Sequence, residues 1–547
     1  MQKGWCFGLL WAGVLFGEEL NLEEIRAASV ASSEGVPLGI VNGVSVITGA
    51  YTEQVSDLEI PGIAPLPLTR SYISEQQKDH TPGQWCIRLD DSLQEVTDER
   101  ERLHALVKRP SGASILYDVS SEDGVYFRPH IPKGYTNASL VVGGKTNLKN
   151  HSLHRSKHGK RFILTTGDGT EFIYHHQEDP EYYELTEENR ASGLSFHHKS
   201  SSKHIVHQVR ALSRAKKLVG WMQEKKTHDK KEHRIIEGSD GSVCHYRFAP
   251  FKIDQFIHDQ GGKRHETHRV WMLVSVSSNR KPSTHYDYTH THDQKSWLLK
   301  KKSLPGGRFL TNDYYAPGKK WMYRKTQGIE KSLFRAKHRN ETDRVLRQEA
   351  PVGVDKTPLP IHRFCYWKSP PEEGRKKSTS PCTDVFDALW HKTRYTYSGK
   401  DRLLHILKYK GNHPYTLYSK EELKWGEKGS SQEGHLLGKY LLNEKEEILG
   451  GQFFRYDKYG NAVEKGVVGC LTGRPCGSIR FTKDRYTQGG ERESTVYVYS
   501  KDQLNFLESE HHANGLSIHY QHPKGVDQLH GKITLFQGQV KHREFYS

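Results

Sequence analysis

The sequence is poor in the features that mark helical, zinc-binding or membrane-spanning proteins. Only 34% of its 547 residues are hydrophobic, and long periodic runs rich in Ala and Leu are missing. Its seven cysteines include no Cys-x-x-Cys pair, which leaves a structural zinc site without support. Beyond the N-terminus no apolar run is long enough to cross a bilayer as a helix, so we expect no transmembrane span.

The motifs of common catalytic sites are missing as well. There is no Gly-x-Ser-x-Gly nucleophile turn, no His-Glu-x-x-His zinc helix and no glycine-rich phosphate loop ending in Lys-Ser or Lys-Thr. The 65 acidic residues could supply the carboxylate pair of a glycosidase, but nothing in the sequence singles out a pair. We therefore expect a non-catalytic protein without catalytic residues or a cofactor. An autonomous enzyme is the remaining alternative.

Aromatic residues, glycine and positive charge are what the sequence has in quantity. Aromatics make up 10% of the chain, with 28 Tyr and 10 Trp beside 49 Gly, a composition typical of strands and turns. The formal net charge of +16 points to polyanionic neighbours such as nucleic acid, anionic glycans or a membrane surface. Because the basic residues are interleaved with acidic ones, we interpret the charge as solubilising and do not expect nucleic acid as a partner.

The N-terminus predicts export. Lys3 is followed by an apolar run over residues 4–16 and then by acidic residues, Glu18 and Glu19. That run has the length of a signal-peptide core and is short for a membrane span. We expect a signal peptide over residues 1–17 and a secreted or cell-surface protein. An uncleaved apolar helix is the alternative.

Six cysteines would remain after cleavage, an even number but a sparse one for a disulfide-dependent fold. Only Cys470 and Cys476 are close in sequence, in CLTGRPC, where a turn could bring them together. This pair is the candidate disulfide.

From about residue 161 one pattern recurs. A turn rich in Asp, Gly or Asn leads into or follows a strand with aromatic residues at alternate positions, which places the rings on one face. One hairpin cannot bury such a face alone, so we expect a mostly β protein of stacked antiparallel β-hairpins, with an ordinary antiparallel sandwich as the alternative. The copies are Gly167–His176, Ser239–Phe248, Thr284–His290, His362–Trp367, Thr393–Ile406, Phe454–Lys465, Thr495–Leu507 and Gly515–Gly525.

One copy carries a resemblance to a known family. The Rhs/YD-repeat family has repeats centred on Tyr-Asp followed by a Gly-Asn turn, and the sequence resembles that core at Tyr456, Asp457, Tyr459, Gly460 and Asn461. Residues 44–74, which contain TGAY, DLEIPG and PLPLTRSY, resemble the N-terminal domain of bacterial Rhs proteins. Residues 304–318 and 344–353 resemble variant segments of the same group. The other repeats are degenerate.

The resemblance implies a spiral, shell-like sheet of β-hairpins, often closed around a toxic C-terminal cargo. It divides the chain into a signal peptide (1–17), a linker or short helix (18–42), an Rhs-type N-terminal β domain (43–160) and a degenerate repeat array (161–547). The family's Asp-Pro-rich end segment is missing, and GQVKHREFYS stops where another repeat would begin. We therefore expect an incomplete shell with an unpaired edge strand, and a toxin or cargo chain encoded separately as its partner.

Two further groups of residues are candidate binding sites. His290, His292 and Asp293 could together hold a divalent metal, with a solvated His-rich loop as the alternative. A carbohydrate- or cell-surface-binding module is the second hypothesis for the whole chain. Its candidate glycan contacts combine ring stacking with positive charge, or else form a solvated charged face: Trp221, Trp297, Lys300, Lys301 and Lys302.

Overall fold

The structure is a computed structural model, and its described part is almost entirely antiparallel β. The only helical element there is one 3-10 turn, Pro305–Gly307. The described residues are 39–61, 65–74, 85–87, 92–97, 103–108, 114–121, 124–129, 152–156, 160–166, 170–176, 182–190, 193–199, 208–225, 232–259, 262–291, 297–315, 320–322, 333–335, 343–352, 356–367, 380–398, 402–411, 415–427, 432, 435–457, 461–473, 477–482, 487–500, 507–522 and 530–545. The predicted signal peptide and most of the predicted linker lie outside them.

The first strands form an inner segment, defined here as the described residues from 39 to 87. Its sheet runs β3–β4–β5, beside a small β1–β2 pair. In β4 Leu66, Leu68 and Tyr72 are buried and alternate with less buried residues, as period two requires. The strands are β1 (Ile40–Val41), β2 (Val44–Ser45), β3 (Thr52–Ile60), β4 (Leu66–Ile73) and β5 (Trp85–Ile87).

The main sheet is separate from the inner segment. It has 31 strands and closes on itself, which confirms the predicted spiral, shell-like β fold. Closure occurs where β13 pairs with β6 as well as with β12 and β14. Strands β6 to β13 thereby form a ring around a core that includes Phe127, Phe162 and Tyr183. The ring strands are β6 (Ser92–Thr97), β7 (Leu103–Lys108), β8 (Ser114–Val119), β9 (Tyr126–Pro129), β10 (Ser152–Arg155), β11 (Arg161–Thr165), β12 (Glu171–His176) and β13 (Tyr182–Asn189).

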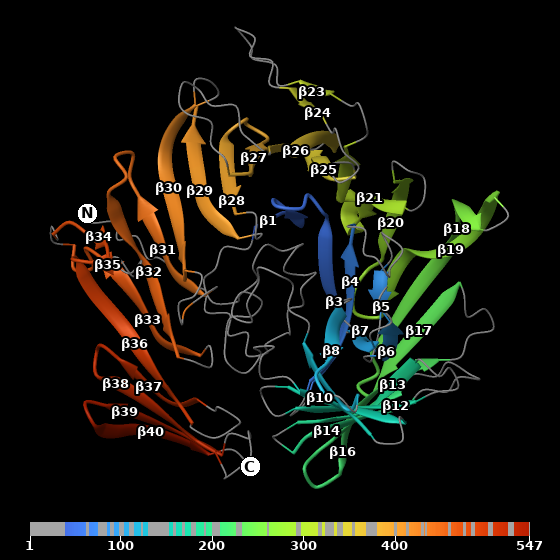
Figure 1. Ribbon diagram of the computed structural model, residues 1–547, viewed down its shortest axis with the longest axis horizontal. Helices are drawn as coiled ribbons and strands as arrows, with labels where there is room; N and C mark the ends of the chain where they lie inside the picture. Colours follow the sequence, from blue (N-terminus) through green and yellow to red (C-terminus); the bar gives the residue numbers. More distant parts are fainter. Residues whose placement is uncertain are drawn as a thin grey trace.

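From β13 the sheet continues as a long curved wall, which Figure 1 shows bending around the inner segment. The wall strands are β14 (Ser195–Lys199), β15 (Gln208–Leu212), β16 (Leu218–Lys225), β17 (His233–Gly238), β18 (Val243–Asp259), β19 (Gly262–Ser278), β20 (Thr284–His290), β21 (Trp297–Ser303), β22 (Phe309–Tyr314), β25 (Val345–Val352), β26 (Thr357–Trp367), β27 (Cys382–Asp387), β28 (Lys392–Tyr397), β29 (Leu403–Lys410), β30 (Thr416–Trp425), β31 (Leu436–Leu442), β32 (Ile448–Tyr456) and β33 (Ala462–Gly469). The predicted domain boundary at residue 160 falls between β10 and β11, which pair in this same sheet.

The sheet ends in an arm, defined as β36 to β40, drawn in red in Figure 1. Two short pairs, β23–β24 and β34–β35, lie outside the main sheet. The strands are β23 (Lys320–Met322), β24 (Leu333–Arg335), β34 (Arg480–Phe481), β35 (Thr487–Gln488), β36 (Glu491–Tyr499), β37 (Leu507–His512), β38 (Leu516–Gln521), β39 (Gly531–Phe536) and β40 (Gln539–Phe545).

One kind of turn recurs between neighbouring strands. The N–H of its first residue donates to the carbonyl four residues later in the turns that begin at Thr166, Ser213, Asp387, Asn443 and Asp457. In three of these turns a carboxylate or amide oxygen of the first residue also accepts backbone N–H groups. Many strand pairs shift register once through a β-bulge, and bulges increase local twist and bending. Repetition of both features curves the sheet.

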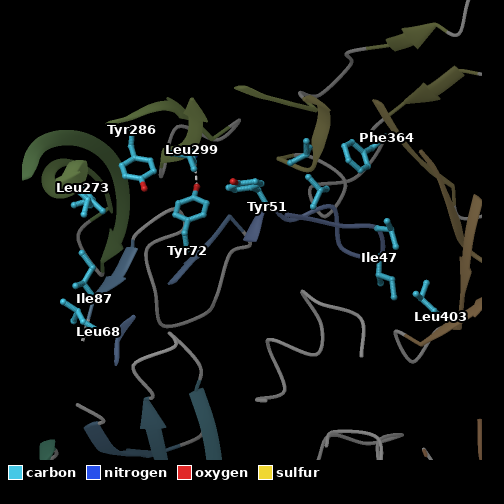
Figure 2. Close-up of a cluster of buried hydrophobic side chains, with 14 of the residues drawn as sticks. Ile47, Tyr51, Leu68, Tyr72, Ile87, Leu273, Tyr286, Leu299, Phe364 and Leu403 are labelled. Carbon is cyan, nitrogen blue, oxygen red and sulfur yellow. Dashed lines mark hydrogen bonds between the residues drawn. The ribbon is translucent and has the colours of Figure 1, made fainter. Parts of the chain in front are cut away.

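The main core lies between the wall and the inner segment. It joins Val44, Leu68 and Tyr72 of the inner segment to wall residues such as Tyr246 and Phe364. Figure 2 shows side chains of both parts meeting in this core. The wall rings are buried because the inner segment covers them, and not only because neighbouring hairpins stack.

Candidate functional interface between the inner segment and the wall

A buried ion pair connects the inner segment to the wall. Arg70 on β4 donates through Nε to Oδ2 of Asp57 on β3 at 2.7 Å, and the two residues are 2% and 7% exposed. The phenol of Tyr246, on wall strand β18, donates to the same oxygen at 2.8 Å. Burial raises the pKa of Asp57, and the Arg70 charge opposes that shift. Asp57 thus links two inner strands to one wall strand.

Aromatic rings enclose the Arg70 guanidinium. Its Cζ lies 4.3 Å from the ring centroid of Trp85 and 5.2 Å from that of Tyr286, which is a wall residue. The Trp85 indole N–H donates to the hydroxyl of Tyr288 at 3.0 Å. Burying an isolated charge is unfavourable, and cation–π contacts of this kind help to offset that cost for the Arg70 guanidinium.

A second contact uses Tyr72, which is 2% exposed. Its hydroxyl accepts the backbone N–H of Leu299 at 2.7 Å, the bond drawn as a dashed line in Figure 2. The Tyr51 hydroxyl donates to Glu53 at 2.8 Å, and Glu53 also pairs with the wall residue Lys302. Burial raises the pKa of both Tyr51 and Tyr72, so both phenols stay protonated near neutral pH.

Amide groups make a third contact at the start of the described chain. Asn42 donates through Nδ2 to Oε1 of Gln348 at 3.1 Å, and Gln348 Nε2 donates to Oδ1 of Asn312 at 3.0 Å. Val345 N–H donates to the carbonyl of Gly49 at 2.9 Å. Gln348 and Asn312 are buried, and each of these bonds satisfies a polar group that would be costly to bury alone.

Burial keeps one thiol and three phenols at this interface in their neutral forms. Burial raises the pKa of the Cys244 thiol, beside Tyr246, to about 12, and therefore keeps it protonated. The phenols of Tyr246, Tyr286 and Tyr288 have pKa values raised by burial. A protonated thiol and protonated phenols are poor nucleophiles, whereas they suit a fixed hydrogen-bonded contact.

The predicted repeat turn is partly described. The hydroxyl of Tyr456 donates to the Leu436 carbonyl at 3.1 Å, and its ring stacks on His435 with centroids 4.3 Å apart. Asp457 N–H donates to the carbonyl of Asn461 at 3.0 Å, and Asn461 Nδ2 donates to Oδ2 of Asp457 at 2.8 Å. These contacts close the turn. Tyr459 and Gly460 lie outside the described residues.

The candidate glycan contacts are engaged within the protein. Trp297 donates its indole N–H to the Lys252 carbonyl at 3.0 Å and packs on Phe251. The three lysines bind different partners: Lys300 pairs with Asp313, Lys301 lies 4.9 Å from the Phe309 ring centroid, and Lys302 pairs with Glu53. Trp221, on β16, is half-buried. Glycan binding by these residues stays a prediction.

The candidate metal residues are also only partly described. The His290 ring packs at a tilt against Trp297, with centroids 3.6 Å apart, while His292 and Asp293 lie outside the described residues. Within the described ranges no group of three or more His, Cys, Asp or Glu side chains is placed to hold a metal ion. Cys470 is in a disulfide bond; its predicted partner, Cys476, lies outside the described residues.

The sequence contained a signal for the interface that the prediction did not use. Alternation in LPLTRSY places Arg70 on the same face as Leu66, Leu68 and Tyr72. A charged residue on a buried face requires a partner charge, and Asp57 in the preceding strand supplies it.

No described helix of this chain is long and apolar enough to cross a membrane. Residues 41–117 match a model for a domain of unknown function, DUF6531. That match covers the inner segment from residue 41 onward and the ring strands as far as residue 117, within β8. No match among curated proteins was found.

Among solved structures, similarity extends to toxin assemblies at low identity. The Photorhabdus luminescens Tc holotoxin pore is 9% identical over 87% of this chain, with a TM-score of 0.21, and the TcdB2-TccC3 crystal structure is 9% identical over 95%, with a TM-score of 0.19. The chain spans 26% and 30% of their lengths. TM-scores this low do not establish a shared fold.

Proposed function

We propose that this chain is a non-catalytic, exported scaffold of the Rhs type. Its curved wall encloses its own inner segment and, in this proposal, a second polypeptide as cargo. The cargo in this proposal is a separate toxin chain, as the resemblance of the Tyr456–Asn461 turn and of residues 44–74 to Rhs proteins implies. The observation that carries the proposal is the shared core. Wall and inner segment belong to separate sheets, with no strand ladder between their described residues, yet they bury one hydrophobic cluster.

Enclosure through side chains differs from extension of a sheet. If the wall bound the inner segment by strand pairing, the two sheets would have to share a strand edge. Instead the wall contacts the inner segment through alternate side chains on one face of the sheet. The contacts reach far along the chain: Asn42 bonds Gln348, and Arg234 bonds the Ile87 carbonyl at 3.1 Å. Contacts at such separations fit a surface that surrounds its contents from several sides.

Two observations support export and a non-catalytic role. A disulfide at Cys470 is typical of proteins that fold in oxidising compartments. At the interface, the titratable side chains are paired or protonated, which leaves no activated nucleophile among Asp57, Cys244 and Tyr246.

Hydrogen exchange of the full chain tests the enclosure. Amides of β4, inside the wall, should exchange far more slowly than those of β40, which lies in the arm, because opening β4 requires release of the shared core. Equal exchange in the two strands would contradict enclosure. A glycan array tests the carbohydrate-binding hypothesis, which requires glycan binding that survives moderate salt and is lost on Trp221→Ala or Trp297→Ala.

A further inference from the structure

Four exposed apolar side chains lie close together on wall strands β31 to β33 and on the turn that follows β33. Leu441 is 41% exposed, Val467 36% and Leu471 43%. Leu449, the extra residue of the β-bulge between β31 and β32, is 52% exposed. We call these four residues the apolar patch. Single exposed apolar residues are ordinary, whereas a group of them marks an interaction surface.

The strand register places the patch on one face of the sheet. Leu441 pairs with Gly450, and Gly450 pairs with Gly469 on the next strand, so these positions share a face. Val467 lies two residues before Gly469 and shares that face as well. The Cδ2 of Leu471 is 3.7 Å from the position that a Cβ of Gly469 would occupy. Paired glycines inside strands let side chains or another chain come close to the backbone.

The patch continues the surface that binds the inner segment. Gly450 and Phe454 lie on the same face of β32, because the register against β33 is unbroken between them, and Phe454 belongs to the main core. On the other side, Leu423 of the main core pairs with Lys439, two residues before Leu441. In Figure 1 strands β31 to β33 lie between the wall strands around the inner segment and the red arm. The face that binds the inner segment thus extends to exposed apolar residues.

Two carboxylates border the patch on strand β36. Glu493 pairs with Val467 and Glu491 pairs with Gly469, so both carboxylates are on the face of the patch. Glu491 accepts the hydroxyl of Thr472 at 2.5 Å and its backbone N–H at 2.6 Å, and these bonds lower the pKa of Glu491. Glu493 is exposed. Both side chains are therefore ionised near neutral pH.

The lysines that share this face are engaged elsewhere. Lys439 pairs with Glu421 at 3.2 Å, and Lys465 lies 4.9 Å from the ring centroid of Tyr497. Neither border carboxylate forms an ion pair within the described part of the chain. In a chain with a net charge of +16, the border of the patch is thus locally acidic. Charge complementarity favours a basic partner there.

We propose that the apolar patch binds an aliphatic segment of another polypeptide that carries basic residues beside it. The aliphatic side chains pack on the exposed leucines, and the border carboxylates bind the neighbouring lysines or arginines. Contact is made through side chains on a sheet face, as it is between the wall and the inner segment. The segment belongs to the cargo, and in that respect the inference rests on the proposed function.

Two labelled peptides test the proposal on the full chain by fluorescence anisotropy. Both contain a Leu-Val-Leu-Val core, one with two lysines at each end and the other with two glutamates at each end. The lysine-flanked peptide should bind more tightly. Leu441→Ser/Leu449→Ser should weaken it about tenfold, because two side chains that are about half exposed can no longer be covered by the peptide. Failure of the lysine-flanked peptide to bind the wild-type chain would overturn the proposal.

A matched variant controls for the loss of exposed apolar side chains. Val496 and Val498 on β36 are 42% and 40% exposed, and alternation places them on the opposite face of the sheet from Glu493. Val496→Ser/Val498→Ser should leave binding of the lysine-flanked peptide unchanged. An equal loss in the two double variants would show that the peptide binds exposed apolar residues anywhere, and the proposal would be wrong.

Charge reversal tests the selection of a basic partner. Glu493→Lys should weaken the lysine-flanked peptide severalfold and strengthen the glutamate-flanked one. Glu171→Lys, at an exposed position of ring strand β12, makes the same change in net charge and should alter neither. If both variants weaken the lysine-flanked peptide equally, general electrostatic attraction is responsible and the selection is refuted.

Two further outcomes separate this inference from the enclosing function. Dimerisation of the wild-type chain, seen by sedimentation and lost in Leu441→Ser/Leu449→Ser, would assign the patch to a second copy and overturn the inference. Slow hydrogen exchange in β4 without peptide binding would leave enclosure supported and refute the patch. Peptide binding with equal exchange in β4 and β40 would support the patch as a binding site and contradict enclosure.

Discussion

The wall and the arm are built from the same elements but differ in what covers them. Both consist of antiparallel strands joined by short turns, and both contain β-bulges. Wall strand β27 has the burial pattern of a core strand, with five of six residues buried, whereas none of the seven residues of β40 is buried. The main hydrophobic core reaches Ala462 on β33 and includes none of the described residues of the arm.

This difference shows that the local pattern specifies strands while tertiary contact determines their stability. Burying a large apolar side chain contributes about 1.5–3 kcal/mol, and the wall gains this at many positions from the inner segment. The arm depends mainly on its backbone ladder and on exposed cross-strand pairs. We therefore expect the arm to open locally while the wall remains folded.

The largest expected effect is on the wall and follows loss of the buried cation. Arg70→Ala leaves Asp57 buried beside Tyr246 without its counter-charge, which should lower the free energy of unfolding by about 3–5 kcal/mol. Urea titration would measure the loss, and hydrogen exchange should show it in β3 and β4. Arg280→Ala breaks the more exposed ion pair between Arg280 and Asp240 and should lower the free energy of unfolding by less than about 1 kcal/mol. Equal losses of unfolding free energy in Arg70→Ala and Arg280→Ala would show that burial of the ion pair does not determine its contribution.

A core truncation compares the two regions directly. Leu299, on wall strand β21, is fully buried, and its backbone N–H donates to Tyr72 of the inner segment, so Leu299→Ala should cost about 2–5 kcal/mol through lost packing and the cavity it leaves. Val540→Ala, in the arm, removes a side chain that is 45% exposed and should cost less than about 1 kcal/mol. Thermal or urea unfolding measures both. A large loss at Val540 would indicate that the arm has a core of its own.

Strand positions could be predicted from the sequence, but the packing of the inner segment could not. The predicted strand Thr284–His290 coincides with β20, and Asp457 and Asn461 of the predicted repeat turn are hydrogen-bonded to each other, while Tyr459 and Gly460 lie outside the described residues. Period two identifies which residues share a face, but not what that face meets. The contacts that bury it join residues such as Asn42 and Gln348, 306 positions apart, and no local pattern encodes such a pairing.

The pH dependence of stability should also distinguish the regions. Burial, together with the charge of Arg402, lowers the pKa of His435 from its usual value to about 4, although Asp457 opposes the shift. Because the unfolded chain then binds the proton more readily than the folded one, stability should fall as the pH drops from about 6.5 to 4, by about 3 kcal/mol in all from this residue.

Urea unfolding at both ends of that pH range measures this loss. His435→Phe keeps an aromatic ring against Tyr456 and removes the titrating group, so it should reduce the slope of unfolding free energy against pH. His519→Phe, at an exposed position of the arm, is the matched control and should leave the slope unchanged. A slope that is the same in wild type and His435→Phe would assign the acid sensitivity to other groups.

The smallest effect concerns two asparagines at comparable turns. Asn461 is 2% exposed, and its Nδ2 donates to Oδ2 of Asp457, so Asn461→Ala should cost about 1–2 kcal/mol, because it removes a buried hydrogen bond. Asn514, in the arm, accepts the Leu516 N–H at 3.0 Å from an exposed turn, where water can replace it, so Asn514→Ala should cost less than about 0.5 kcal/mol. Unfolding of the two variants side by side measures the difference. Equal costs would mean that the turns alone, and not the cover supplied by the inner segment, determine how firmly each hairpin is held.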